Sequence, residues 1–259
     1  MGESTLLLTM DDLKAGIADH LGFTRDSTAW TTRQTEQITA SLNAGLRQAY
    51  FPPLLDGQAA PHTWTFLKPT FRLSTVAEQT EYDLPDDLFG IEDDITLGSE
   101  SILSANPTIR MVSPEKMLAL RQSVSYSGVP VHAAMRTKTA DGHSTPRYEL
   151  MIFPTPDTAY TLTMRYCLIP QALTADAPYP LGGAIHSEML MASCRAAADA
   201  LYNDNPRGGT WAEFMTRLAV SVAIDMRVGA PATLGRNTTR RRSHGLSYRH
   251  RYGGRVTFD

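Results

Sequence analysis

The apolar residues of this chain change their period twice along its length, and this change limits the folds that the chain can adopt. Between Tyr160 and Leu168 apolar side chains alternate with Thr, Arg and Cys. A two-residue period is that of a β-strand with one buried face. Towards both ends of the chain the spacing becomes three and four residues, which is the period of an amphipathic helix. The sequence therefore predicts helices at both ends and strands in between.

Two helices are expected before Pro52. Thr9 can cap the first, and Thr31 with Gln34 forms a capping box at the start of the second. Each helix has one apolar stripe, which has to pack against another element. The stripes are Leu13, Ile17 and Leu21 in the first helix and Ile38, Leu42, Leu46 and Tyr50 in the second.

The middle of the chain predicts an antiparallel hairpin. Residues 148–152 alternate like a strand, Pro154 to Asp157 form a turn, and the alternating run from Tyr160 to Leu168 follows. Upstream, Ser113-Pro114-Glu115 is typical of the start of a short helix. It supplies a cap, a proline in the first turn and an acid at the positive end of the helix dipole.

Two further helices are expected after residue 183. The first, Ala184 to Tyr202, is apolar on more than one side, which predicts burial by more than one neighbour. Thr210 with Glu213 predicts a capping box for the second helix, which ends at Gly229. Its apolar stripe is expected to be Trp211, Met215, Leu218, Val222 and Met226.

We therefore expect an α+β fold for these 259 residues. The N- and C-terminal helices are expected to form one helical bundle, with an inserted antiparallel β-rich domain and an extended C-terminal arm. The expected parts are 1–60 for the N-terminal helical part, 61–178 for the β-rich insert, 179–229 for the C-terminal helical part and 230–259 for the basic arm.

Charge is segregated between this arm and the rest of the chain. The arm carries seven arginines and one acid, which leaves 17 basic and 26 acidic residues on the body. The arm is thus near +6 and the body near −9, so the arm is expected to dock in an ordered way on something acidic, either another protein or a nucleic acid. Aromatic residues between the arginines favour stacking as well as charge pairing. The expected docking residues are Arg236, Arg240, Arg241, Arg242, Tyr248, Arg249, Arg251, Tyr252, Arg255 and Phe258.

Composition and motifs argue against several classes of protein. No apolar run approaches the roughly 20 residues of a membrane span, and Leu6 to Leu8 are too few for a signal peptide. Cys167 and Cys194 are isolated, which favours a soluble protein made in a reducing compartment. The sequence has no phosphate-binding glycine loop, nucleophile elbow or paired-His zinc helix. We therefore expect no enzyme activity, no cofactor, no metal and no membrane partner.

Two groups of chemically active residues have simpler explanations. Five acids between residues 86 and 94 lack the ligand spacing and the glycine of a calcium loop, so a solvated loop or a lining that repels a polyanion is favoured over a metal site. His186 and Glu188 lie on different faces of a helix, and Cys194 falls in an apolar stripe, so packing is favoured over a catalytic cysteine. The five acids are Asp86, Asp87, Glu92, Asp93 and Asp94.

The order of these features resembles the head-to-tail connector, or adaptor, proteins of tailed bacteriophages, including the podovirus tail tubular protein A type. The segment Tyr82-Asp83-Leu84-Pro85-Asp86-Asp87-Leu88-Phe89 is similar to the family's Tyr-x-Leu-Pro-x-Asp-Phe element, and Gly128-Val129-Pro130 precedes the strand pair. The early amphipathic helices, the Pro-x-Pro-Asp turn, the two late helices and the Arg/Gly-rich end are also similar. The chain departs from the family at His132 and Ala133, where an aromatic residue is common, and at Leu88-Phe89, which replace a single aromatic residue.

The resemblance implies a structural virion protein of the head–tail interface, assembled in the host cytoplasm. It implies a homo-oligomeric ring, typically twelve-fold, below the portal protein, with tail or nozzle proteins on the other side. Genomic DNA would pass through the lumen without specific binding. The helical part would form the ring core, the arm would reach the portal and the β-rich part would face the tail. A net acidic body suits such a conduit, because carboxylates repel DNA phosphates.

Two other functions stay open on the sequence alone. A nucleic-acid-binding protein could use the arginine arm as a non-specific clamp, and a cell-wall hydrolase of a phage tail could place two carboxylates in a cleft. Portal binding without DNA affinity near physiological salt would separate the adaptor from the clamp. Activity on cell wall, with Asp87→Asn or Asp93→Asn as controls, would identify the hydrolase.

Overall fold

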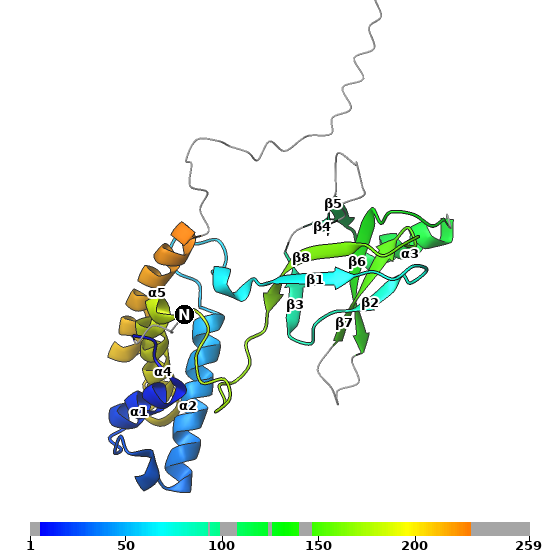
Figure 1. The fold of residues 1–259 in the computed structure, drawn as a ribbon. Coiled ribbons are helices and arrows are strands. Elements are labelled where there is room, and N and C mark those ends of the chain that lie inside the picture. The colour runs from blue at the N-terminus through cyan, green and yellow to red at the C-terminus, as the bar shows by residue number, and fades with distance from the viewer. Residues whose placement is uncertain (1–5, 93, 99–107, 124–125, 140–146, 229–259) are drawn as a thin grey trace, which may run out of the picture.

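The structure has a helical part and a β-rich part, which lie side by side and are joined by short segments (Figure 1). It is a computed structural model that describes residues 6–92, 94–98, 108–123, 126–139 and 147–228. Four helices, from both ends of the chain, make up the helical part. They are α1 (Met10–His20), α2 (Thr32–Tyr50), α4 (Ser187–Tyr202) and α5 (Gly209–Val228).

The first two helices begin where the sequence predicts. Thr9 caps α1 and Thr31 caps α2, and each forms a complete capping box, with Asp12 and Gln34 respectively. Each box satisfies backbone N–H groups that have no partner within the helix. The apolar stripe of α2 is buried as expected, from Ile38 to Tyr50.

The four helices share one apolar core, to which the two ends of the chain both contribute. Within it, α2 and α4 approach so closely that a Cβ added to Gly45 would lie 2.4 Å from the Cα of Cys194. The Ser193 hydroxyl donates to the Gly45 carbonyl over 2.8 Å, and Cys194 is fully buried. Glycine at position 45 is therefore required by the close contact of two backbones.

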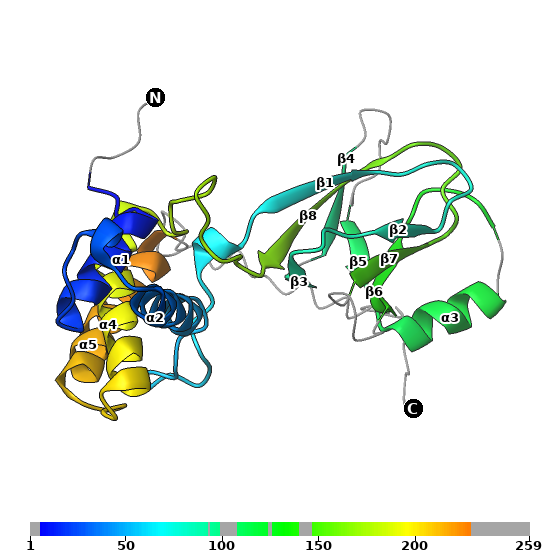
Figure 2. The ribbon, with the colours of Figure 1, turned by 90° about the horizontal axis from the view of Figure 1, so that it is seen from below.

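The broad apolar surface of α4 is buried by its own chain. The helix contacts α1, α2 and α5 (Figure 2), and its residues from Met189 to Ala198 are almost all buried. The prediction of burial on more than one side is thus confirmed. Because intrachain helices supply that burial, it is not an argument for a neighbouring protomer.

The capping box predicted for α5 is wrong, and the predicted apolar stripe is correct except at Met226. The helix begins at Gly209, so Thr210 lies inside it, and the Thr210 hydroxyl donates to the Asp199 carboxylate over 2.6 Å instead of forming a box with Glu213. The predicted apolar stripe is buried in part: Leu218 and Val222 are buried, and Trp211 and Met215 pack against the core, whereas Met226 is 60% exposed. Phe214, Ser221 and Asp225 complete the buried face.

The β-rich part is an eight-stranded sheet whose pairs are all antiparallel except β5 with β6. The strand order is β1-β8-β4-β5-β6-β7-β2, and β3 also pairs with β8. The strands are β1 (Thr70–Ser74), β2 (Glu81–Asp83), β3 (Leu88–Ile91), β4 (Ile95–Gly98), β5 (Thr108–Met111), β6 (His132–Thr139), β7 (Arg147–Phe153) and β8 (Thr161–Leu168).

The predicted hairpin between residues 148–152 and 160–168 is wrong. Both segments are strands, but β7 pairs with β6 and β2, whereas β8 pairs with β1, β3 and β4. The segment between them bonds to other parts of the chain, because Gly128 N donates to Thr155 O and Glu78 N donates to Pro156 O. The two prolines lack an N–H that could close a tight turn, so the chain crosses to a different place in the sheet.

The sheet curls around its own apolar core. Its end strands β1 and β2 are consecutive in the chain, and the Tyr82 hydroxyl, bonded to Val76 and Gln79, fixes the loop between them. Leu150 and Ile152 face this core together with Leu162, Met164 and Tyr166 of β8. Helix α3 (Pro114–Ser123), which starts as the sequence predicts, covers the opposite face of β6 and β7 through Met117.

The buried carboxylate of Asp225 joins the helical part to the chain that leads into the sheet. It accepts hydrogen bonds from Thr65 N over 3.0 Å and from His62 Nε2 over 2.8 Å. Thr65 begins the short 3₁₀ helix η2 (Thr65–Leu67), which directly precedes β1. A second carboxylate, Asp199, bonds in the same way to His20, Asn203 and Thr210 and so joins α1, α4 and α5.

The α+β class predicted from the sequence is confirmed. The division of the chain at residues 60, 178 and 229 stays a prediction, and the C-terminal arm lies outside the described residues. Two shorter 3₁₀ helices, η1 (Ser27–Ala29) and η3 (Ala184–His186), complete the described elements.

Gly45→Ala should lower the free energy of unfolding by about 1–3 kcal/mol, because the added methyl group would overpack against the α4 backbone. The gain in helix propensity of about 1 kcal/mol opposes this loss only in part. Urea denaturation followed by circular dichroism measures the change. Gly128→Ala is the matched control, since no atom lies within 4 Å of its added Cβ. Equal stability of the two variants would contradict the close contact.

Asp225→Asn should cost on the order of 1–3 kcal/mol at pH 7, because a charge-assisted acceptor is lost at a buried site. Burial raises the pKa of Asp225, but the hydrogen bonds from Thr65 and His62 together hold the pKa below its ordinary value. A lowered folded-state pKa stabilises the fold above the ordinary Asp pKa of about 4, and this stabilisation is lost as the pH falls further. The difference in the free energy of unfolding between wild type and variant should therefore disappear below about pH 4, as measured by urea titrations. Asp56→Asn, at an exposed position, serves as control. A difference in the free energy of unfolding that does not depend on pH would exclude this role of the Asp225 carboxylate.

Candidate assembly surfaces

An apolar groove lies where the helical part meets the sheet. It has a volume of about 560 Å³, and its walls come from the end of α2, from residues 61–67, from β3 and from the end of β8. This size is in the range of roughly 300–1,000 Å³ that is typical of binding pockets. The lining includes Tyr50, Phe51, Pro52, Trp64, Phe89 and Leu168.

Two exposed phenylalanines stand at this groove for different local reasons. Phe51 is the C-cap of α2, immediately before Pro52 and Pro53, and it is 55% exposed. Phe89 lies where the β3–β8 register shifts between Leu88 and Gly90, and it is 62% exposed. A β-bulge redirects the side chain of the extra residue, so the ring of Phe89 points away from the sheet core.

On the polar side of the groove, Lys68 and Cys167 both contact the carboxylate of Glu92. Lys68 Nζ lies 2.8 Å from Glu92 Oε2, and the Cys167 thiol donates to Glu92 Oε1 over 3.2 Å. Burial and the neighbouring Glu92 raise the pKa of Cys167 to about 11, so the thiol stays protonated at neutral pH. It is therefore not an activated nucleophile.

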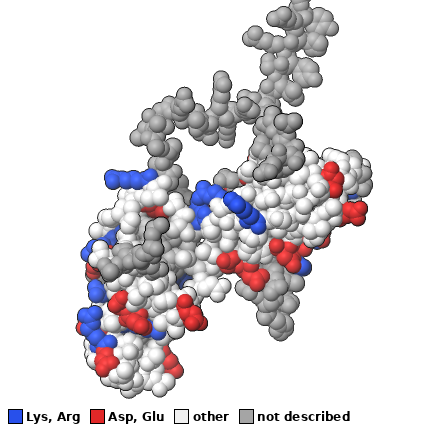
Figure 3. Space-filling model, viewed as in Figure 1, with Lys and Arg blue, Asp and Glu red and all other residues white. Residues whose placement is uncertain are grey.

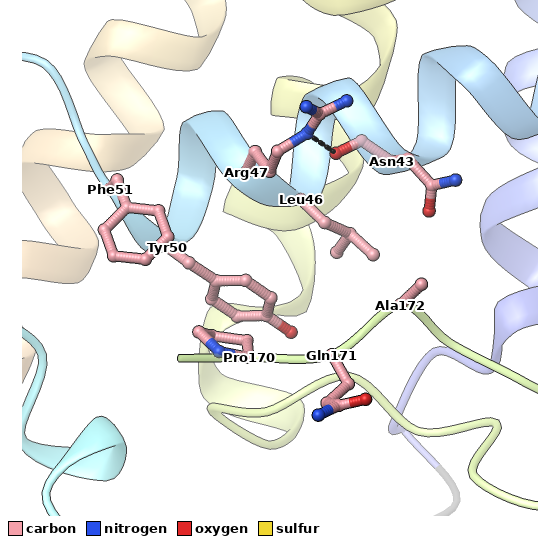
Figure 4. A pocket seen from close by; sticks show the side chains of 8 residues that line it. All are labelled: Asn43, Leu46, Arg47, Tyr50, Phe51, Pro170, Gln171 and Ala172. Carbon is pink, nitrogen blue, oxygen red and sulfur yellow. Dashed lines mark hydrogen bonds between the residues drawn. The ribbon is translucent and has the colours of Figure 1, made fainter. Parts of the chain in front are cut away.

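A smaller pocket of about 260 Å³ lies between the last turns of α2 and residues 170–172 (Figure 4). Tyr50 lines it, and its hydroxyl accepts a hydrogen bond from Leu181 N over 2.9 Å. Burial raises the pKa of Tyr50 to about 12. Arg47 Nε donates to the Asn43 carbonyl of its own helix, as Figure 4 shows. The Tyr50–Leu181 bond holds the chain that returns from the sheet against α2.

Helix α5 has an open apolar face opposite α4. Ala219, Val220, Ala223 and Met226 are exposed there, with Val220 at 56% and Met226 at 60%. Residues of the loop that follows α2, such as Leu55 and Gln58, line a groove of about 470 Å³ beside this face. From Leu218 to Met226 the only charged residue is Asp225, which is buried, so a neutral patch covers two turns of the helix.

The acidic cluster predicted from the sequence is divided by β3. Glu92 pairs with Lys68, and Asp94 Oδ1 accepts from Met111 N over 3.2 Å, whereas Asp86 and Asp87 precede the strand. Asp93 lies outside the described residues. Within the described part of the chain, no three His, Cys, Asp or Glu side chains are grouped so as to hold a metal ion.

His186 and Cys194 both pack in the core of the helical part. The His186 ring lies 5.3 Å from the rings of Trp64 and Phe66, and burial lowers its pKa. Cys194 lies in the shared helical core against Gly45, and burial raises its pKa to about 12. Neither residue is placed as a nucleophile or as its base.

The ten arm residues predicted to dock, from Arg236 to Phe258, lie outside the described residues. Sequence reasoning missed the groove, because its walls come from separate segments and no local motif indicates it. Bulky aromatic residues beside helix-breaking prolines and turns, such as Phe51, were the available signal.

The described surface carries charges of both signs. Figure 3 shows acidic and basic side chains interspersed over one face, with white surface over much of the area between them. Among the described residues, no helix combines the length and the apolar character needed to cross a bilayer.

Comparison with known proteins gives one family. The model of the SU10 adaptor protein family matches residues 8–241, which include both helical segments, the whole sheet and the first part of the arm. No curated protein matches the chain. The family match confirms the resemblance to phage head-to-tail adaptors. The chain therefore belongs to the SU10 adaptor protein family, whose members are structural adaptors of bacteriophages.

Proposed function

We propose that this protein is a head-to-tail adaptor, which forms a homo-oligomeric ring, twelve-fold as is typical of such adaptors, below the portal and joins the capsid to the tail. The family match over nearly the whole chain is the observation that carries this proposal. The ring is assembled in the host cytoplasm and lies in the neck of the virion. Its partners are the portal protein on one side and tail or nozzle proteins on the other.

The open face of α5 is our candidate for the lateral contact between neighbouring protomers. Exposed apolar patches of this kind mark protein–protein contacts. In a ring each protomer uses two different surfaces, so the α5 face of one copy meets another surface of the next copy. Small residues such as Ala219 and Ala223 permit a close approach of that surface.

The basic arm is our candidate for the attachment to the portal. Its arginines provide fixed bidentate contacts for carboxylates on an acidic portal surface. The division at residues 60, 178 and 229 separates a ring-forming helical part, a tail-facing β-rich part and this arm. The excess of acids on the body keeps DNA from binding in the lumen, since like charges repel.

Ala223→Glu should reduce ring formation at least about tenfold. An unpaired carboxylate buried at an interface costs on the order of 2–5 kcal/mol, and each 1.4 kcal/mol is tenfold in the equilibrium constant. Sedimentation velocity and negative-stain electron microscopy of the purified protein, alone and with portal, measure ring formation. Ala40→Glu is a matched control, because Ala40 is an exposed helical alanine on α2. Rings of normal yield from Ala223→Glu would exclude this face.

Replacing Arg240, Arg241 and Arg242 together by Ala should weaken portal attachment about tenfold, because each exposed ion pair contributes roughly 0.2–1 kcal/mol. Co-sedimentation with purified portal measures the attachment. The control replaces the exposed Arg25, Arg33 and Arg207 of the body by Ala, which changes the net charge equally.

The same variants also test the nucleic-acid clamp. Strongly salt-dependent DNA affinity that disappears with the arm arginines, in a protein that does not attach to portal, would replace the adaptor function by the clamp.

A further inference from the structure

We propose that the C-terminal segment 248–258 docks in the groove between the helical part and the sheet of its own chain. Its aromatic rings would contact Phe51 and Phe89. This inference concerns the free protomer and does not depend on the proposed function.

The groove exposes apolar surface to water, which is unfavourable in free energy. Two phenylalanines at it are more than half exposed, at 55% for Phe51 and 62% for Phe89, and Trp64, Pro52 and Leu168 line the space between. Exposed apolar area on this scale favours a covering segment, since each Å² removed from water contributes about 25 cal/mol.

The covering segment starts next to the groove. Asp225 on the last turn of α5 bonds to His62, which lines the groove, and Val228 lies three residues further along the helix, about 4.5 Å along its axis. Figure 1 shows this end of α5 close to the segment that enters β1. From Val228 to Tyr248 are 20 residues, whose mean span as a coil is about 25 Å, so the groove is within reach.

The chemistry of the segment matches that of the groove. Tyr248, Tyr252 and Phe258 supply aromatic rings, and aromatic pairs stack with centroids about 4.5–7 Å apart. Asp86 and Asp87 directly precede the groove strand β3, and the arm is basic, so these charges are complementary, whereas Glu92 after the strand is already paired with Lys68. Arg249 and Arg251 stand next to the rings, where they can pair with these two aspartates or stack on the two phenylalanines.

The occupant is the arm of the same chain because tethering raises its local concentration. A short linker gives an effective concentration on the order of millimolar, which exceeds the concentration of a neighbour's arm in dilute solution. At that effective concentration, a dissociation constant on the order of 0.1 mM would suffice for an occupancy of about ten to one.

The test is site-specific photo-crosslinking in the full chain, with benzoylphenylalanine in place of Tyr252. This substitution keeps an aromatic ring at the position. Mass spectrometry of the dilute protein should map most crosslinks to residues 50–52, 61–67, 88–92 and 167–168. A mixture of ¹⁵N-labelled and unlabelled protein should show that both peptides come from one chain.

Phe51→Ser with Phe89→Ser should reduce the yield of these crosslinks about tenfold. Both residues are exposed, so the fold should persist, which circular dichroism checks. Ile185→Ser with Leu201→Ser is the matched control, because these residues are exposed to 65% and 50% and lie outside the groove. Crosslinks that map elsewhere, that join two chains, or that persist in the Phe51 and Phe89 variant would overturn the proposal. The experiment does not measure portal attachment, so its result tests the docking of the arm independently of the adaptor function.

Discussion

The contact between α2 and α4 at Gly45 is the constraint on which the rest of the structure depends. It joins a helix from the first fifth of the chain to one from the last third, and it brings the two backbones to a distance that no side chain at position 45 would permit. Once these helices are paired, α1 and α5 pack against α4 and complete one core. The segment between α2 and α4 must then leave and return at the same place. The β-rich part is therefore an insertion that departs after Tyr50 and comes back past the same tyrosine, whose hydroxyl bonds to Leu181 N.

Two buried carboxylates fix the positions of the helices and of the chain that leads into the sheet. Asp225 holds the outgoing chain at His62 and Thr65, and Asp199 holds the ends of three helices together. Each has its pKa lowered by hydrogen bonds that exceed the effect of burial. Removing such an acceptor leaves buried donors without partners, so these acids fix geometry more than they add net stability. For a structural adaptor, which associates with other phage head and tail proteins, a fixed angle between its two parts is the useful property.

Two surfaces of the described part of the chain are apolar. The open face of α5 and the groove between the two parts both expose large apolar side chains. The thiols of Cys167 and Cys194 and the hydroxyl of Tyr50 have raised pKa values, so these three groups stay protonated at neutral pH. This pattern is typical of a protein that assembles with others, and it agrees with the membership of the adaptor family.

The sequence by itself determined the five α-helices, the strands β7 and β8, and the starts of α1, α2 and α3. Capping boxes at Thr9 and Thr31, the proline start of α3 and the alternation in β8 depend on neighbouring residues only, and local hydrogen bonds and periodicity decide them. Strand partners and the groove at Phe51 and Phe89 were decided by the tertiary structure alone. β7 and β8 are adjacent in sequence but bond to different strands, because hydrogen bonds from Gly128 and Glu78 capture the segment between them. Such contacts join residues that are far apart in the chain, and no local pattern of side chains carries that information.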